Sequence, residues 1–296
     1  MAREAAVAVA LAFVLAACGG GSAGATYPAT APKSVRIPDF THVVIVVFEN
    51  HEATEIGSSS SAPTFNALAR SYASLTNYDA VAHPSLPNYL ALVSGSTQGI
   101  SSDCTDCIVS ARSLADALEA AGKTWKTYAE DLPYPGFTGG SAGRYAKKHD
   151  PFLYFRHVVG SRAMRRRVVP FTQLWRDLAR HRLPDFSLVV PNLCDDMHDC
   201  SVATGDAWLK ARIVPLLHSP ELRGGVVFVV FDEGTSDTGG GGRIEALALG
   251  PTVQRGSRFT KATNHYGLLR TIEDAWDLPR LGHSRTGTPI GGIWKK

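Results

Sequence analysis

The hydroxyl of Ser85 lies in a stretch, residues 82–95, whose pattern puts it at the start of a helix. Pro84 favours extended backbone before it, Pro87 suits a first helical turn, and the apolar residues 90–93 follow. The first turn of a helix offers unpaired backbone N–H groups and the positive end of the helix dipole, which together favour a phosphate-like anion. A serine there can cap the helix, attack a bound ester, or do both.

Two carboxylates, Asp232 and Glu233, directly follow the apolar run 225–231, which is typical of a fully buried strand. Side by side at the end of such a strand they repel each other unless a cation or a proton lies between them. A metal ion is the simplest explanation.

A second polar cluster, Glu49 and Asn50, follows the β-branched run 41–48. Ligands of open α/β sheets gather at the carboxyl ends of parallel strands, although a plain polar turn would give the same pattern. Together with Asp232 and Glu233 these side chains make an oxygen-rich set, which suits Mg²⁺, Ca²⁺ or Mn²⁺. The identity and number of the metal ions stay open, with Zn²⁺ included.

A third polar cluster follows the short strand pattern 185–190. Within residues 191–200 it contains Asn192, Asp196 and His198, which can bind a metal or hold a phosphate. A solvated acidic loop is the alternative.

The elements that carry these clusters alternate between strand and helix patterns, which indicates an α/β fold with a largely parallel sheet. Residues 130–167 break this alternation with prolines, glycines and scattered aromatic side chains. We predict that this segment is a long excursion over the active-site edge that shapes the substrate pocket.

Five motifs resemble those of the bacterial phosphoesterase family that contains acid phosphatases and phospholipases C, within the alkaline-phosphatase-like superfamily. They are Glu49-Asn50, Ser85-x-Pro87-Asn88, Pro191-Asn192 with Asp196-x-His198-Asp199, Asp232-Glu233-Gly234, and the helix pattern from Asn264-His265-Tyr266 to Asp274. The resemblance implies a three-layer α/β/α sandwich with a largely parallel central sheet.

The resemblance also implies a role for each matching residue. Ser85 would be the nucleophile that forms a phosphoserine, assisted by His198 and His265. The implied metal ligands are Glu49, Asn50, Asp196, Asp232 and Glu233, and the implied substrate-binding residues are Asn88, Asp103 and Asn192. Relatives with two zinc ions have aspartate and histidine where this chain has Glu49 and Glu233, which favours one metal with histidine acid–base help.

The function expected from this set is an exported, metal-dependent phosphomonoesterase of the acid-phosphatase type. A phospholipase C or other phosphodiesterase is the first alternative, made less favourable because the chain lacks the long insertion and extra C-terminal domains of such phospholipases. A non-catalytic surface lipoprotein that keeps the fold is the second.

The 296 residues carry a formal charge of +3, too mild for a nucleic-acid partner. We predict a single phosphoesterase domain over residues 37–296. The basic cluster in residues 162–167 is a solvated face or, alternatively, a contact with an anionic membrane.

The first 17 residues have the pattern of an export signal, and Leu15-Ala16-Ala17-Cys18 resembles a lipobox. We therefore predict lipidation of Cys18, a flexible tether over residues 18–36, and a cell-envelope protein anchored to the membrane. Ordinary secretory cleavage is the alternative.

Four further cysteines, an even number, suit two disulfide bonds outside the cytosol. Spacing alone does not fix their connectivity. We prefer the local pairs, Cys104 with Cys107 and Cys194 with Cys200, because each would staple a loop beside a predicted site.

Overall fold

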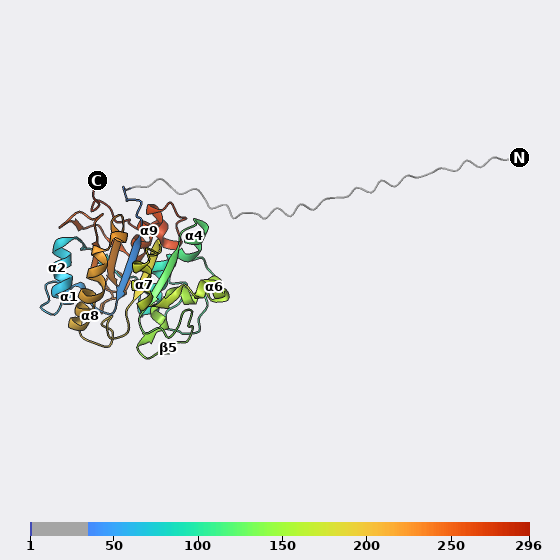
Figure 1. Cartoon of the computed structure of the whole chain (residues 1–296), viewed down its shortest axis with the longest axis horizontal. Helices are drawn as coiled ribbons and strands as arrows, with labels where there is room; N and C mark the ends of the chain where they lie inside the picture. The colour runs from blue at the N-terminus through green and yellow to red at the C-terminus, as the bar shows by residue number, and fades with distance from the viewer. Residues whose placement is uncertain (2–34) are drawn as a thin grey trace.

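The computed structural model describes residue 1 and residues 35–296 (Figure 1). The predicted signal peptide, the lipidated Cys18 and most of the predicted tether lie outside the described residues. In the part of the chain that the structure describes, no helix combines the length and the apolar character needed to span a membrane.

An eight-stranded sheet forms the centre of the fold. From one edge to the other its strands are β11 (Arg258–Phe259), β2 (Ala73–Leu75), β10 (Ala246–Leu249), β9 (Val226–Phe231), β1 (Val43–Phe48), β8 (Phe186–Val190), β4 (Trp125–Ala129) and β7 (Val168–Pro170). All neighbours pair in parallel except β10, which is antiparallel to both β9 and β2. The predicted α/β fold with a largely parallel central sheet is confirmed.

The central strands β1 and β9 position the acidic side chains of the site. Both are buried along their whole length, as their continuous Val and Phe runs predict. They pair in register up to Phe48 and Phe231, and the N–H of Asp232 donates to the carbonyl of Phe48 at 2.9 Å. Glu49 and Asp232 therefore leave the sheet side by side.

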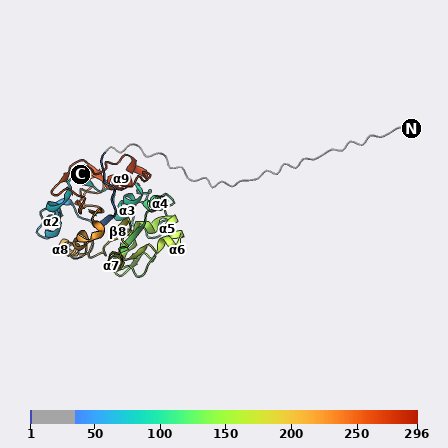
Figure 2. The same ribbon diagram turned by 45° about the horizontal axis from the view of Figure 1, so that its top comes forward.

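Helices cover both faces of the sheet (Figure 2). On one side α3 packs against α4 and α9, and on the other α2 packs against α8. Phe48 of β1 shows the second contact, because its ring lies edge-on to Phe65 and Trp208. These helices are α2 (Pro63–Ser71), α3 (Ser85–Ser94), α4 (Leu114–Ala120), α8 (Val202–Trp208) and α9 (His265–Ala275).

Shorter elements complete the fold. Two short strands lead towards Ser85: β2 joins the central sheet, while β3 pairs with β12 in a separate two-stranded sheet. The excursion over residues 130–167 contains a β-hairpin and two short helices before β7. The short elements are α1 (Ala53–Ile56), β3 (Tyr78–Asp79), β5 (Ser141–Ala142), β6 (Tyr145–Ala146), α5 (Arg156–Gly160), α6 (Arg162–Arg165), α7 (Thr172–Ala179) and β12 (Thr263–Asn264).

Helix α3 ends at a glycine, Gly95, whose backbone leaves no room for a side chain. Gly95 has a φ of 71°, and a Cβ added there would lie 2.1 Å from the carbonyl oxygen of Leu281. The left-handed backbone and the close approach both require the missing side chain.

Candidate active site

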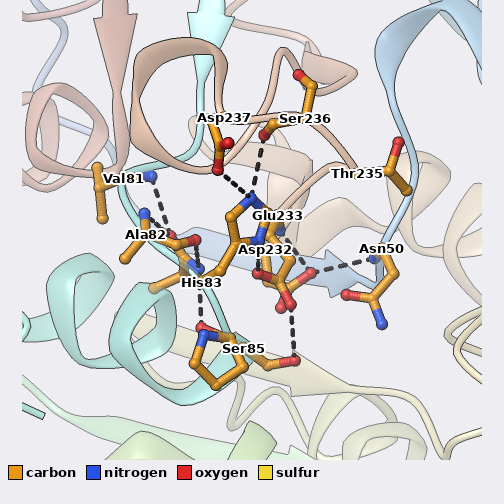
Figure 3. A network of polar contacts seen from close by, with 12 residues as sticks. Asn50, Val81, Ala82, His83, Ser85, Asp232, Glu233, Thr235, Ser236 and Asp237 are labelled. Atoms are coloured by element: carbon orange, nitrogen blue, oxygen red, sulfur yellow. Dashed lines mark hydrogen bonds and ion pairs between the residues drawn. The ribbon is translucent and has the colours of Figure 1, made fainter. Parts of the chain in front are cut away.

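The Ser85 hydroxyl lies at the start of α3, as the sequence predicts, and is buried. Its Oγ donates to Glu49 Oε2 at 3.0 Å. The same Oγ lies 3.4 Å from Glu233 Oε1 (Figure 3). Three segments far apart in the sequence thus bring one alcohol and two carboxylates together.

The loop before Ser85 is held by Asn88. Its Oδ1 accepts from the N–H groups of Val81 and Ala82, at 3.0 and 3.1 Å. Its Nδ2 donates to the carbonyls of Ala82 and Pro84, at 2.7 and 3.3 Å. With its amide engaged in this way, Asn88 holds the loop that leads to Ser85, and its role in substrate binding stays a prediction.

The two carboxylate oxygens of Asp232 differ in their hydrogen bonds. Its Oδ1 accepts from the N–H groups of Asn50 at 3.3 Å and Glu233 at 2.6 Å, whereas its buried Oδ2 has no hydrogen-bond partner among the described residues (Figure 3). Asn50 Oδ1 is likewise buried, and no described residue gives it a hydrogen bond. Burial, together with the charges of Glu49 and Glu233, raises the pKa of Asp232 well above its usual range. Negative oxygens packed this closely repel one another unless a positive charge lies among them.

His83, which the sequence patterns did not assign to the site, supplies part of that charge when it is protonated. Its Nδ1 lies 2.5 Å from Glu233 Oε2, and its Nε2 lies 3.0 Å from the carbonyl of Ser236 (Figure 3). Burial opposes a charge on His83, but these two partners outweigh it and raise its pKa. The one feature of the sequence that could have indicated a role for His83 is its position two residues before Ser85.

A second buried cluster shares Glu49 with the first. His149 lies with Nε2 3.3 Å from Glu49 Oε2 and with Nδ1 3.2 Å from Asp196 Oδ2. One ligand atom from each of these three residues lies within 4.8 Å of the others, close enough to hold a metal ion. Tyr89 stacks on the His149 ring, with centroids 5.2 Å apart, and donates its hydroxyl to Glu49 Oε1.

Charges within this cluster are coupled. Burial opposes a charge on His149, but Glu49 and Asp196 outweigh it and raise the pKa of His149 to about 9. Burial alone would raise the pKa of Glu49, yet His149 and Tyr89 lower it to about 2. Burial raises the pKa of Asp196 to about 6. Without a metal, His149 is therefore an imidazolium between carboxylates at neutral pH.

This ion pair gives a testable dependence of stability on pH. Because the pKa of His149 rises from 6.5 to about 9 on folding, its contribution is complete below pH 6.5 and disappears as the pH rises towards about 9. In EDTA-treated protein, we expect His149→Gln to remove up to about 3 kcal/mol of the fall in unfolding free energy across this range. Urea unfolding of both proteins at the two ends of the range measures it. Equal falls would contradict the assignment.

Lys148 brings a cation to the other side of α3. Its Nζ lies 3.1 Å from Asp103 Oδ2 and 3.1 Å from His198 Nε2. Asp103 also accepts the N–H of Leu86 through Oδ1 at 2.9 Å, in the first turn of α3. Burial would lower the pKa of Lys148, but Glu49 and Asp103 outweigh it and raise that pKa. Lys148 is therefore an ammonium group close to where a phosphate would meet the helix.

We expect Asp103→Ala to lower kcat/KM for p-nitrophenyl phosphate by about tenfold, because both the helix contact and the lysine contact are lost. Asp103→Asn is the matched control. This variant keeps an oxygen for the N–H of Leu86, so its kcat/KM should fall clearly less. Wild-type kinetics in Asp103→Ala would show that Asp103 does not position the site.

Two predicted residues have all their polar atoms engaged by the protein. His265 places Nδ1 3.1 Å from the Tyr78 hydroxyl and Nε2 2.6 Å from the carbonyl of Asp232, and burial lowers its pKa to about 4. Asn192 donates its amide to Asp131 and Asp195 at 3.1 and 3.2 Å. These contacts fix the orientation of both side chains, and the predicted catalytic role of His265 and substrate-binding role of Asn192 stay predictions.

Both predicted disulfides are present, Cys104 with Cys107 and Cys194 with Cys200. The first follows Asp103 directly. The second closes the loop that carries Asp196 and His198. Each bond therefore restrains a loop that contributes to the site.

The structure thus brings together Ser85, Glu49, Asp232 and Glu233, with Asn50 and Asp196 beside them. The residues that sequence reasoning missed are His83, Tyr89, Lys148 and His149. For the last two, a signal existed in the polar run 147–150, which interrupts an otherwise aromatic segment. Nothing in the sequence alone tied that run to Glu49.

Solved structures with low sequence identity share this fold. A protein of the alkaline phosphatase superfamily from Vibrio parahaemolyticus aligns with a TM-score of 0.57 and 15% identity, over 90% of this chain and 76% of that chain. Murine ectonucleotide pyrophosphatase/phosphodiesterase 5 aligns with a TM-score of 0.53 and 13% identity, over 82% and 96%. The fold is that of the alkaline phosphatase superfamily.

Sequence comparison is more specific. The Phosphoesterase family matches residues 57–279. The chain is 36% identical over 261 residues to a phosphatidylinositol-3-phosphatase of Mycobacterium tuberculosis, covering 87% of this chain and 84% of that protein. It is 32% identical over 229 residues to an acid phosphatase of Aspergillus fumigatus, covering 73% of this chain and 51%, about half, of that protein. The chain belongs to the Phosphoesterase family and is a hydrolase of phosphate esters.

Proposed function

We propose that the protein is an exported, metal-dependent phosphomonoesterase that works through a phosphoserine on Ser85. The observation that carries the proposal is the position of Ser85 Oγ, at a helix start and within 3.0 and 3.4 Å of Glu49 and Glu233 carboxylate oxygens. An alcohol so placed can meet a phosphate ester bound at the first turn of α3.

The residues fit a divalent cation. Asp232 Oδ2 and Asn50 Oδ1 are buried without a hydrogen-bond partner among the described residues, and a buried polar atom of this kind costs free energy unless something binds it. Carboxylate and amide oxygens are the ligands that hard cations prefer. We expect Glu49, Asn50, Asp232 and Glu233 to hold one ion. His149 and Asp196, which share Glu49, would hold a second ion or form the ion pair described above.

A divalent cation bound there would lower the pKa of the Ser85 hydroxyl and neutralise charge on the ester's phosphate oxygens. The Ser85 hydroxyl then gives its proton to Glu233, whose Oε1 lies 3.4 Å away and whose pKa burial raises, and its oxygen bonds to phosphorus. The bond from phosphorus to the leaving oxygen breaks, and the leaving alcohol takes up a proton. Glu49 orients Ser85 by accepting its hydrogen bond, since a carboxyl with a pKa of about 2 is a weak base.

Residues on the other side of the site complete the reaction. Lys148 stabilises the phosphate charge as an ammonium group. His198, which is 27% exposed, is the proposed proton donor to the leaving group; its Nε2 lies 3.1 Å from Lys148 Nζ and its Nδ1 2.7 Å from Asp199 Oδ1, so Nε2 has to leave Lys148 and carry a proton when the ester binds. Water then hydrolyses the phosphoserine and regenerates Ser85.

Hydrolysis of p-nitrophenyl phosphate compared with p-nitrophenylphosphorylcholine tests the substrate class. The phosphatase names of the relatives favour the monoester, including a phosphorylated lipid headgroup such as that of the Mycobacterium tuberculosis relative. We expect a higher kcat/KM for the monoester across a panel of divalent ions and pH values. Preference for the choline diester would instead support a phospholipase C, and inactivity on both would support a non-catalytic surface protein.

We also propose export, with a lipid anchor on Cys18. The two disulfide bonds support it because such bonds persist in oxidising compartments. Metabolic labelling with a radioactive fatty acid is expected to mark the wild-type chain and leave Cys18→Ser unlabelled. A labelled Cys18→Ser chain would contradict the anchor.

A further inference from the structure

A cavity lies away from the carboxylate and histidine residues around Ser85. Its volume is about 550 Å³, and it is bounded by α1, α2, β2 and the segments next to β10 and β11. None of the residues assigned above to the metal ions or the nucleophile lines it. The lining residues used here are Ser58, Arg70, Thr76, Glu245 and Arg258.

Glu245 provides an unbalanced negative group in the wall. No hydrogen bond or ion pair reaches its carboxylate from the residues that the structure describes. Burial alone raises the pKa of Glu245 to about 7, so no neighbouring cation offsets the cost of its charge. A half-buried carboxylate without a partner among the described residues is stabilised when a cationic donor binds it.

Two cations line the same cavity. Arg70, near the end of α2, and Arg258, in the edge strand β11, are exposed, and neither has an ion-pair partner within residues 35–296. The planar guanidinium group binds carboxylates through two parallel hydrogen bonds, a geometry that an ammonium group does not offer.

We propose that this cavity binds a small aminodicarboxylate, with its ammonium group on Glu245 and its carboxylates on Arg70 and Arg258. The charges match in number and sign, two cations and one anion in the protein against two anions and one cation in the ligand. The volume lies in the range of small-molecule sites. Hydroxyl groups on the wall, among them those of Ser58 and Thr76, offer further hydrogen bonds to a polar ligand.

Isothermal titration calorimetry of the full chain with L-aspartate and L-glutamate tests the proposal. Succinate is the matched control, because it has the dicarboxylate skeleton of aspartate without the ammonium group. We expect at least one amino acid to bind about tenfold or more tightly than succinate. Failure of both amino acids to bind, or equal binding of succinate, would overturn the proposal.

Variants separate this site from the catalytic one. Glu245→Gln, which keeps the side-chain shape, is expected to weaken amino-acid binding by about tenfold, and Arg258→Gln to weaken it as well. Ser85→Ala should bind as the wild type does, and Glu245→Gln should hydrolyse p-nitrophenyl phosphate at the wild-type rate. Unchanged binding in both cavity variants, or binding lost in Ser85→Ala, would contradict the location.

Discussion

Replacing Ser85 with alanine is expected to lower kcat for p-nitrophenyl phosphate by at least roughly 10³-fold, because the variant has no oxygen to form the covalent intermediate. The side chain is small and lies at a helix start, so the change should leave the far-ultraviolet circular dichroism spectrum and the urea midpoint close to those of the wild type. Steady-state kinetics at saturating divalent ion measures the effect.

Ser94→Ala is the matched control for this variant. Ser94 is also buried and ends the same helix, where its hydroxyl donates to the carbonyl of Leu90 at 2.7 Å. Its loss should cost stability but leave kcat within a few-fold of the wild-type value. Similar kcat values for Ser85→Ala and Ser94→Ala would remove Ser85 as the nucleophile.

Removal of divalent ions with EDTA is expected to lower turnover by at least roughly 100-fold, because the carboxylate cluster then lacks the charge that activates Ser85. Added Mg²⁺, Ca²⁺, Mn²⁺ or Zn²⁺ should restore activity, and the ion that does so at the lowest concentration identifies the preferred metal. Asp232→Asn, which alters the oxygen with no partner among the described residues, should raise the concentration needed for half-maximal rescue by about tenfold or more.

Asp185→Asn is the control for Asp232→Asn, because it removes an acidic charge at a position away from the site. Asp185 precedes β8, at the end of the sheet opposite the site, and lies 3.4 Å from Lys123. We expect its metal requirement to match that of the wild type. Full activity of the wild-type protein after exhaustive chelation would contradict the metal-dependent mechanism.

The sequence predicts the site best where a local residue pattern also determines which residues lie close together in space. The apolar runs of β1 and β9 predict buried parallel strands, and parallel strands bring their carboxyl ends to one edge. Glu49 and Asp232 meet there for that reason, in register through Phe48 and Phe231. Ser85 follows the same logic, because Pro84 and Pro87 define the helix start in which it lies.

Other features depend on contacts between distant segments, which no local pattern encodes. His149 reaches Glu49 from an irregular excursion whose path is set by packing, so its pairing could not be read from the 147–150 run. Asn88 fits the nucleophile motif, but only the structure gives its four contacts to the preceding loop. The short strands β2 and β3 are close in sequence but join different sheets, which depends on their distant partners.

The phosphoserine itself offers the most direct test of the account. Wild-type protein with its metal is mixed with a phosphate monoester, quenched in acid within the first turnover, digested and analysed by tandem mass spectrometry. We predict one phosphoryl group on the peptide containing Ser85, localised to that serine and absent from Ser85→Ala. Phosphoryl transfer to another residue, or rapid turnover with Ser85 unmodified at every quench time, would contradict the central claim.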